Sequence, residues 1–488
     1  MSYTMGRVEE IYAAHEGRGQ TTLAAQLGAL YREQRSAFER DSAPDARVRR
    51  ERLRLLERVL LDNADAITNA ISADFGHRPA TETQLIEVFQ SLESLRYARR
   101  HVGRWMRPER RHVAIWYRPG QAHVRYQPLG AVGIVVPWNY PLYLSVGPLA
   151  SALAAGNRAM LKLSEYTPAF GALFADLIAK TFPRDLVHVV LGDVETARAF
   201  VDLPFDHLLY TGSTAIGREV MAAAARNLTP VTLELGGKSP AIIAPGFDPA
   251  RAAQRIVFGK LVNAGQTCIA PDYVLAQASS IETLLAHMRR TARDLYRDAA
   301  SLDYASIAHD RQYARLTSML DDARAQGARI EPLLDAGNSS LPRRMPPVAV
   351  LNATDAMRVM REEIFGPILP IVPYQSLDEA VRYVNERERP LALYVFDDDT
   401  ARRERLLAST ASGGVVINDT LLHVSQDDLP FGGVGPSGMG RYHGPEGFRT
   451  FSQVRSVFTQ RRLNTLPLLY PPYDRPLGRR ILKFMLRG

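Results

Sequence analysis

The chain has 488 residues, of which 46% are hydrophobic and 23% are charged. This balance is typical of a soluble globular protein and excludes the disordered and fibrous classes. At ~150 residues per domain, the length indicates two or three domains. The formal net charge is +8, but the basic residues are not gathered beside aromatic or glycine-rich recognition motifs. The densest basic stretch, residues 99–112, is interpreted as a solvated helical surface, so we expect no nucleic-acid partner.

Cys268 is the single cysteine of the sequence. One thiol can form neither an intrachain disulfide nor a zinc-thiolate framework, which fits a reducing compartment. The N-terminus carries Glu9, Glu10 and Glu16 and has no apolar core of signal-peptide length. The longest apolar stretch, 141–155, is interrupted and is shorter than the ~18 residues of a membrane span. We therefore expect a cytoplasmic protein, without a membrane span and without a metal site.

The first part of the chain predicts helices and then a hairpin. Apolar residues recur at helical spacing over 47–73, which indicates amphipathic helices. Polar and apolar residues alternate over 112–128 around Pro119 and Gly120, which predicts a hairpin. Strand-like and helical runs then alternate, as in βαβ units with a parallel sheet. These strands are expected at 130–136, 158–163, 187–191, 207–210 and 231–235, with helices over 142–155 and 169–179.

A second α/β pattern follows Gly237, so the predicted fold class is α/β with two lobes. Its strands are expected at 240–243, 273–276, 348–351, 369–372, 392–396 and 414–417, and a surface loop is expected at 335–347. In open sheets of this kind the ligand lies beyond the carboxyl ends of the strands. Candidate functional residues are therefore those that directly follow the predicted strands.

Three side chains could carry a thiol reaction. Cys268 lies among small and polar neighbours in NAGQTC, and the N–H groups of such a turn are expected to lower its pKa. The alternative is a structural cysteine of the core. Glu234 ends a strand before Gly236 and Gly237 and is either a mobile base or a salt-bridged strand end. The Asn139 amide, in PWNYP, donates either to an oxyanion or within an Asx turn.

Two further loops could hold a nucleotide. Thr211–Thr214 with Gly217 closes one strand and opens a helix, whose N-terminus suits a pyrophosphate, although the G-x-G-x-x-G pattern is absent. Lys162 and Glu165 lie just past another strand, where a cation and a carboxylate would hold an adenosine ribose.

Seven motifs, in order and over residues ~45–460, together resemble the aldehyde dehydrogenase superfamily. They are PWNYP at 137, LKLSE at 161, FDHLLYTGSTAIGR at 205, LELGGKSP at 233, GQTC at 265, EEIFGP at 362 and LPFGGVGPSGMG at 429. The ending that starts with NDTLLHVSQ at 418 resembles the class 3 branch. ADFGHRP at 73, RRHVAIWYRPG at 110 and NAGQTCIAPDYV at 263 are most similar to the bacterial coniferyl-aldehyde dehydrogenases.

The resemblance implies a role for each matching residue. Cys268 would be the nucleophile, Glu234 the general base, and Asn139 would stabilise the oxyanion together with the backbone N–H of Cys268. The implied cofactor is NAD, with NADP as the alternative. Its implied binding residues are Trp138, Lys162, Glu165, Gly212, Ser213, Gly217, Glu363 and Phe365.

The resemblance also implies a domain plan. A Rossmann-like NAD-binding domain would comprise residues 1–112 and 132–236, and an α/β catalytic domain residues 237–435. Residues 113–131 and 448–488 would form an oligomerisation arm with a C-terminal tail, and two such arms would join a homodimer. The last ten residues, 479–488, mix basic with apolar side chains. They would either pack on their own subunit or make a peripheral contact with a membrane.

The implied reaction is oxidation of an aldehyde to the carboxylic acid with NAD(P), through a thiohemiacetal and a thioester on the cysteine. A tunnel lined by Trp138, Tyr140, Tyr143, Phe431 and Phe448 would suit an aryl aldehyde. With the resemblance, this favours coniferyl aldehyde, which would give ferulate. A medium-chain or fatty aldehyde is the alternative. A more distant one is a cysteine hydrolase that uses His207 or His443 and no nucleotide.

Overall fold

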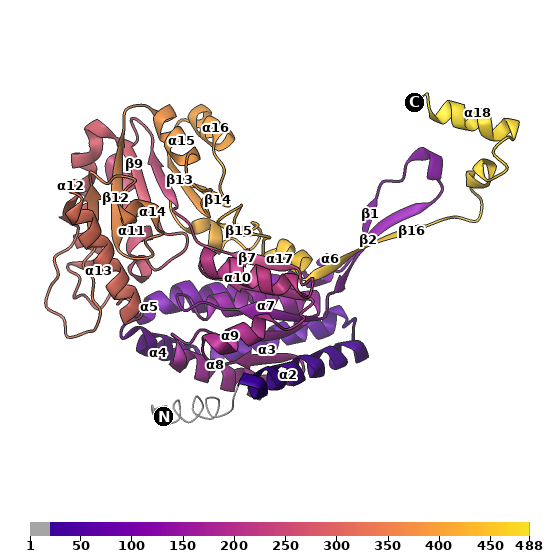
Figure 1. The fold of residues 1–488 in the computed structure, drawn as a ribbon, viewed down its shortest axis with the longest axis horizontal. Coiled ribbons are helices and arrows are strands. Elements are labelled where there is room, and N and C mark those ends of the chain that lie inside the picture. Colours follow the sequence, from indigo (N-terminus) through magenta and orange to yellow (C-terminus); the bar gives the residue numbers. More distant parts are fainter. Residues whose placement is uncertain (1–19, 488) are drawn as a thin grey trace.

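Three sheets organise the chain, and Figure 1 shows them as two adjoining lobes and one projecting arm. The computed structural model describes residues 20–487, so the expectation that rests on Glu9, Glu10 and Glu16 lies outside the described residues. The α/β class is confirmed by the alternation of parallel strands and helices in both lobes.

The first lobe begins with helices, as the periodicity predicts. They are α2 (Gln20–Arg40), α3 (Ala46–Asp62), α4 (Ala64–Phe75), α5 (Ala80–Thr83), the π-helical η1 (Gln84–Phe89) and α6 (Gln90–Trp105). The expected helical stretch 47–73 contains two helices, which meet at Asn63. The predicted apolar face is fully buried in both, with Leu53 and Leu60 on α3 and Ile67 and Ile71 on α4.

The first sheet has the strand order β15-β7-β6-β3-β4-β5. Its strands are β3 (Ala131–Val135), β4 (Arg158–Lys162), β5 (Val187–Val190), β6 (His207–Thr211), β7 (Val231–Glu234) and β15 (Gly438–Met439). The connecting helices are α7 (Tyr143–Ala155), α8 (Pro168–Thr181), α9 (Val194–Val201) and α10 (Thr214–Ala225). All neighbours are parallel except β15, which is antiparallel to β7. The strand order reverses between β3 and β6, and a ligand crevice forms beyond the carboxyl ends of strands at such a point.

The second sheet has the order β10-β11-β12-β9-β8-β13-β14, and only β10 is antiparallel to its neighbour. Its strands are β8 (Pro240–Ile243), β9 (Tyr273–Gln277), β10 (Arg329–Pro332), β11 (Val348–Leu351), β12 (Ile368–Tyr374), β13 (Ala392–Phe396) and β14 (Gly414–Ile417). The helices are α11 (Pro249–Leu261), η3 (Val262–Gly265), η4 (Ala278–Ser280), α12 (Ile281–Tyr296), α13 (Asp310–Ala325), α14 (Arg358–Arg361), α15 (Leu377–Asn385), α16 (Thr400–Ser409) and η5 (Leu422–Ser425). The last helix before the arm strand β16, α17 (Gly444–Thr450), packs instead against α6 and α7 of the first lobe. Residues 335–338 are exposed, as expected of a surface loop.

The arm is a three-stranded antiparallel sheet of β1 (Glu109–Arg111), β2 (Gln121–Pro128) and β16 (Ser452–Thr459). The predicted hairpin is only partly correct, because its first strand is β1 and the short helix η2 (Ile115–Tyr117) follows it. The full-length partner of β2 is β16, a pairing that local alternation does not reveal. Beyond β16 the chain forms η6 (Leu466–Leu469) and α18 (Pro476–Met485) at the far end of the arm (Figure 1).

Candidate active site

Asn139 lies in the loop between β3 and α7, and this loop is held against the turn that carries Cys268. The Asn139 Nδ2 donates to the Gln266 backbone carbonyl at 3.1 Å. In return, the Asn263 side chain donates to the Asn139 backbone carbonyl at 3.0 Å. α7 anchors the other end of the loop, because every residue of this helix is buried. The two loops thus form one unit, and one Nδ2 hydrogen of Asn139 remains for another acceptor.

The turn before Cys268 has an unusual but well-supported backbone. Asn263 and Ala264 both have φ of 50°, in the left-handed region, and Gly265 has 75°. The buried Gln266 side chain fixes this shape, because its Nε2 donates to the Asn263 and Ser306 carbonyls and its Oε1 accepts from the Ala308 N–H. Cys268 follows with intermediate exposure. The turn therefore holds the partly buried Cys268 at a fixed position.

The surroundings of Cys268 raise its pKa to about 12, which makes the expected lowering wrong for the cofactor-free protein. Burial is the largest cause, followed by the negative charges of Glu363 and Glu234. The backbone N–H groups of Cys268 and Ile269 act in the expected direction, but they are outweighed. The thiol is therefore protonated at neutral pH, and the structure brings all three groups close to one another.

Glu234 ends β7 and is only 3% exposed. Among the described residues neither of its carboxylate oxygens has a hydrogen-bond partner, so the salt-bridged alternative is not observed. Burial raises its pKa well above the ordinary value, and Arg441 opposes this only in part. A buried acceptor without a partner is costly unless a ligand or water satisfies it. Burial thus favours the neutral form of Glu234.

Trp138, Glu363 and Phe365, which are among the expected cofactor-binding residues, lie near this acid. Burial raises the pKa of Glu363 to about 8, and its Oε1 has no partner within the described chain. A Cβ at Gly236 would collide with the Glu363 carboxylate, so a side chain there would displace this carboxylate. The Phe365 carbonyl accepts from Gln312 Nε2 at 2.7 Å, and the Phe365 ring meets Trp138 edge to face at 5.3 Å. Trp138, Glu363 and Phe365 therefore share one region, as expected.

The adenosine-side residues follow neighbouring strands of the first sheet. Lys162 is buried at the end of β4, where its Nζ donates to the Leu163 and Gly192 carbonyls. Burial lowers its pKa to about 8, and Glu165 lies 4.0 Å away with its side chain 37% exposed. This carboxylate is free to accept from a ribose hydroxyl.

Gly212, Ser213 and Gly217, which are expected to bind the cofactor phosphates, lie at the junction between β6 and α10. The Gly212 N–H donates to the Glu234 backbone carbonyl at 3.0 Å. Ser213 is the N-cap residue of α10, and Gly217 packs within that helix against Leu235. The N–H groups at a helix N-terminus favour a phosphate.

These groups fit an NAD(P) molecule. The helix N-terminus supplies donors for phosphate, and the unpartnered Oε1 of Glu363 supplies a buried acceptor for a ribose hydroxyl. Both lie at the carboxyl edge of the first sheet or against it, where the strand order reverses. Within the described part of the chain, no group of three His, Cys, Asp or Glu side chains is arranged to hold a metal ion.

Sequence reasoning missed a buried ionic network behind the site. Arg78 is fully buried and pairs with Glu87 and Glu82. Glu87 also accepts from the Leu142 and Tyr143 N–H groups, where α7 begins. Glu82 accepts from the N–H of Asn263 at 3.1 Å. The motif ADFGHRP contains Arg78, but charged residues ordinarily predict a surface, so no local signal marked its burial.

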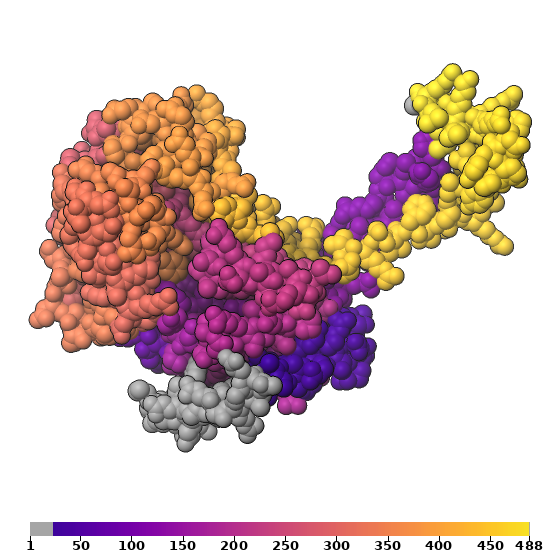
Figure 2. All heavy atoms as spheres, in the orientation of Figure 1, coloured from indigo at the N-terminus to yellow at the C-terminus, as the bar shows by residue number. Residues whose placement is uncertain are grey.

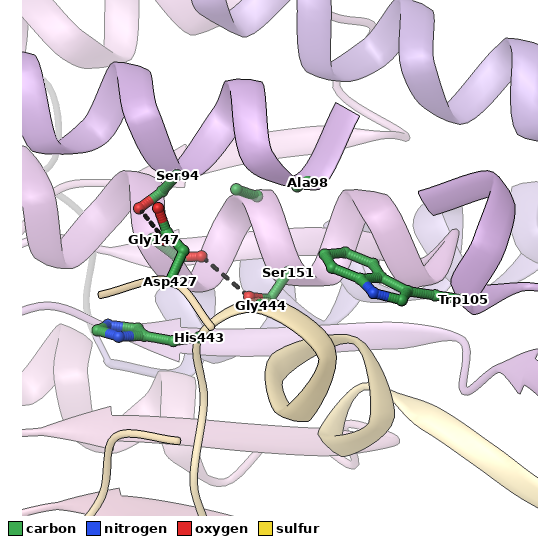
Figure 3. A pocket seen from close by; sticks show the side chains of 9 residues that line it. Ser94, Ala98, Trp105, Gly147, Ser151, Asp427, His443 and Gly444 are labelled. Atoms are coloured by element: carbon green, nitrogen blue, oxygen red, sulfur yellow. Dashed lines mark hydrogen bonds between the residues drawn. The ribbon is translucent and has the colours of Figure 1, made fainter. Parts of the chain in front are cut away.

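The expected aromatic tunnel is only partly supported. The Tyr140 hydroxyl lies 2.6 Å from the Thr267 Oγ1, beside the cysteine turn. Phe448 instead packs against Trp105 and Tyr126 at the base of the arm. A small pocket near this junction lies between α6, α7 and the loop before α17 (Figure 3). None of the proposed catalytic or cofactor-binding residues lines it.

The histidines named for a hydrolase have other partners. His207 lies 2.9 Å from the Thr232 Oγ1 and meets the Phe451 ring edge to face. His443 stacks on Phe431, and its Nε2 lies 3.3 Å from the Tyr143 hydroxyl. Both histidines thus contact hydroxyl groups and aromatic rings. Neither is observed to pair with the Cys268 thiol.

Comparison with known proteins settles the family. The model of the aldehyde dehydrogenase family matches residues 14–457. The chain belongs to this family. It is 52% identical, over 95% of its length and 97% of the relative, to a probable coniferyl aldehyde dehydrogenase of Pseudomonas aeruginosa. A coniferyl aldehyde dehydrogenase of a Pseudomonas species is 47% identical over 90% of the chain and 91% of that protein. A dimeric NADP-preferring aldehyde dehydrogenase of Rattus norvegicus is 38% identical over 90% and 96%.

Solved structures agree. The substrate-bound state of Staphylococcus aureus AldH has a TM-score of 0.88 and 37% identity, and the match covers 94% of this chain and 99% of that one. The Mycobacterium tuberculosis aldehyde dehydrogenase complexed with NAD+ has a TM-score of 0.81 and 30% identity, with 91% of each chain covered. The protein is therefore an oxidoreductase that oxidises aldehydes with NAD(P).

Proposed function

We propose that the enzyme oxidises a phenylpropenal such as coniferyl aldehyde to the hydroxycinnamate, here ferulate. The identity of 52% and 47% to relatives named for coniferyl aldehyde carries this proposal. The edge-to-face pair of Trp138 and Phe365 beside the cysteine turn supports it, because aromatic walls suit a planar aryl group. Medium-chain and fatty aldehydes remain the alternative class.

Cys268, Asn139 and Glu234 are the proposed catalytic residues. Cys268 loses its thiol proton to solvent water, and the sulfur then adds to the aldehyde carbon. The free Nδ2 hydrogen of Asn139 and the Cys268 backbone N–H then donate to the alkoxide oxygen. NAD(P), when bound, is the two-electron oxidant that turns this adduct into a thioester. Its proposed binding residues are Trp138, Lys162, Glu165, Gly212, Ser213, Gly217, Glu363 and Phe365.

Glu234 acts in the second half of the proposed reaction. As a carboxylate it takes a proton from the water that attacks the thioester carbon. The C–S bond then breaks, which releases the carboxylic acid and restores the Cys268 thiolate. The carboxylate oxygens of Glu234 have no partner in the described chain, so they are available for this water.

The substrate proposal is tested by kcat/KM for coniferyl aldehyde, benzaldehyde, hexanal and acetaldehyde under one set of conditions. Binding of the ring away from the reacting carbon should favour the aryl substrates. Cys268→Ala serves as the blank for each substrate. A ranking led by acetaldehyde contradicts the aromatic assignment, and one led by hexanal favours the alternative class.

We also propose a homodimer joined through the arm. β1 and β16 are the edge strands of the arm sheet. Within the described chain no strand pairs with their outer backbone N–H and C=O groups, so these groups are available to pair with a second subunit. A relative at 38% identity is named as dimeric. Light scattering after gel filtration should give twice the 54.2 kDa chain mass, and a mass of one chain contradicts the dimer.

A further inference from the structure

The far end of the arm is rich in basic residues. We define the arm tip as residues 108–120 and 460–487, which hold η2, η6 and α18. Residues 108–120 contain three arginines and one acidic residue, and residues 460–487 contain seven basic residues and one acidic residue. Their combined net charge of +8 equals that of the whole chain, so all other residues balance one another. The arm tip is thus a localised cationic surface.

Helix α18 divides this charge from an apolar face. Leu477, Ile481, Phe484 and Met485 have the spacing i, i+4, i+7 and i+8, which places them on one side of the helix. The other side carries the basic residues Arg479, Arg480, Lys483 and Arg487. No acidic residue follows Asp474. This pattern is that of a helix that lies at an interface between water and lipid.

The apolar face has only a small partner within its own subunit. The Phe484 ring meets Trp116 of η2 edge to face at 5.7 Å, yet Phe484 is 66% exposed and Leu477 is 56% exposed. The other large exposed side chains of the tip are Ile115, Tyr117, Leu463, Leu468, Tyr470, Tyr473, Leu482 and Leu486. Tyrosine and tryptophan are the residues that favour the headgroup region of a bilayer. The tip therefore combines an apolar patch, interfacial aromatic residues and positive charge.

The position of the tip leaves the active site free. Figure 2 shows the arm tip projecting well away from both lobes, which contain Cys268 and the cofactor-side residues. Within residues 20–487 no helix has both the length and the apolarity to cross a bilayer. A contact by α18 is therefore one that lies on a surface, with the lobes held outward.

We propose that the arm tip docks on an anionic lipid surface, with the apolar face of α18 in the headgroup layer and its basic side chains on lipid phosphates. Charge complementarity selects this occupant, because α18 and the two residues after it carry the basic residues Arg479, Arg480, Lys483 and Arg487 opposite the exposed apolar face and no acidic residue.

Vesicle flotation of the purified full-length enzyme tests the proposal. Vesicles of phosphatidylcholine with about 30% phosphatidylglycerol are compared with pure phosphatidylcholine vesicles at low and high salt. The wild type should float with the anionic vesicles only, and less at high salt. The triple variant R479Q/R480Q/K483Q should lose roughly tenfold or more in partition. The double variant L477S/F484S should also lose binding with its charge intact.

A matched control removes three charges from the other end of the molecule. The variant R382Q/R403Q/R405Q changes α15 and α16, far from the arm in Figure 1, and should bind vesicles like the wild type. All variants should keep aldehyde oxidation in solution, because none of these side chains is placed in the active site. Equal loss in control and test variants, or no flotation of the wild type, overturns the proposal. If L477S/F484S instead halves the mass in solution and vesicle binding is absent, the face belongs to a second copy.

Discussion

The guanidinium of Arg78 reaches the active-site loop, because its Nη1 lies 3.4 Å from the backbone carbonyl of Asn139. The same group is paired with Glu87, and its Cζ lies 4.8 Å from the centre of the Tyr140 ring. A buried charge of this kind is stable only while its partners stay in place. Arg78 is therefore a positioning residue for the loop that carries the oxyanion amide.

Arg78→Lys should lower kcat about tenfold, since losing one aligned oxyanion donor can cost ~3 kcal/mol and a tilt costs less. A lysine ammonium lacks the planar set of N–H donors with which the Arg78 guanidinium contacts both glutamates and the Asn139 carbonyl. The KM for NAD should change less than about twofold, because all proposed cofactor-binding residues except Trp138 are on other loops. Steady-state kinetics measures both, with Arg54→Lys as the exposed control. A parallel rise in KM for NAD would instead indicate a general loss of structure.

The protonated state of Cys268 can be tested by alkylation. With a thiol pKa of about 12, the thiolate fraction rises tenfold per pH unit throughout the range from 7 to 10. The rate constant for iodoacetamide should follow this rise in the cofactor-free enzyme, and Cys268→Ala should not be labelled. A plateau below pH 9 would mean that the resting thiol is already activated.

Glu234→Gln separates the two halves of the reaction. The amide cannot take a proton from water, but formation of the thioester does not require it. We expect a rapid burst of reduced cofactor close to one per site, followed by turnover slower by about a hundredfold or more. Stopped-flow absorbance at 340 nm measures both phases. Loss of the burst together with turnover would place Glu234 in the first half-reaction.

The Glu165 carboxylate should repel the 2′-phosphate of NADP, so the wild type should prefer NAD. Glu165→Gln removes that charge and should raise kcat/KM for NADP about tenfold, with a smaller change for NAD. The effect is moderate because the side chain is partly exposed and Lys162 lies 4.0 Å away. Initial rates with both cofactors provide the measurement, and an NADP preference of the unmodified enzyme would contradict the assignment.

His207 should make the fold sensitive to acid. It is 5% exposed, and burial lowers its pKa to about 4 from an ordinary value near 6.5. Between these values the unfolded chain binds a proton that the native chain does not, so stability is present above pH 6.5 and is lost as pH falls towards 4. At pH 5 the loss is roughly 2 kcal/mol. His207→Gln should flatten the fall of Tm between pH 7 and 5, whereas His112→Gln, on the exposed arm, should not.

Most strands of both lobes could be predicted because each is a short apolar run with its own turn signals, whereas the exposed to half-buried β10 and the two-residue β15 were missed. β3, β4, β6 and β7 begin and end within a residue or two of the predicted bounds. Asn139, Glu234 and the start of α10 could be singled out because they directly follow such strands. The pairing of β2 with β16 joins distant segments and leaves no local period, so only the resemblance, which places residues 113–131 and 448–488 in one arm, indicated that these segments associate.

The pKa of the Cys268 thiol and the buried ion pair behind the site could not be predicted from the sequence either. The NAGQTC turn contains the N–H groups that lower a thiol pKa, but the stronger influence is desolvation by surrounding elements. Arg78 and Glu87 illustrate the same limit, because a charged residue in a sequence predicts exposure and only the packed fold shows that the two neutralise each other. Local sequence patterns therefore indicate which residues are candidates for the site, but they do not predict whether these residues are charged.

The high pKa of the Cys268 thiol has a consequence for the enzyme between turnovers. Peroxide attacks thiolates and spares thiols, so a nucleophile that stays protonated at rest is a poor target for sulfenic acid formation. The chain has no second cysteine to rescue an oxidised one as a disulfide. A resting thiol therefore slows oxidation of Cys268, the sulfur on which the proposed reaction depends.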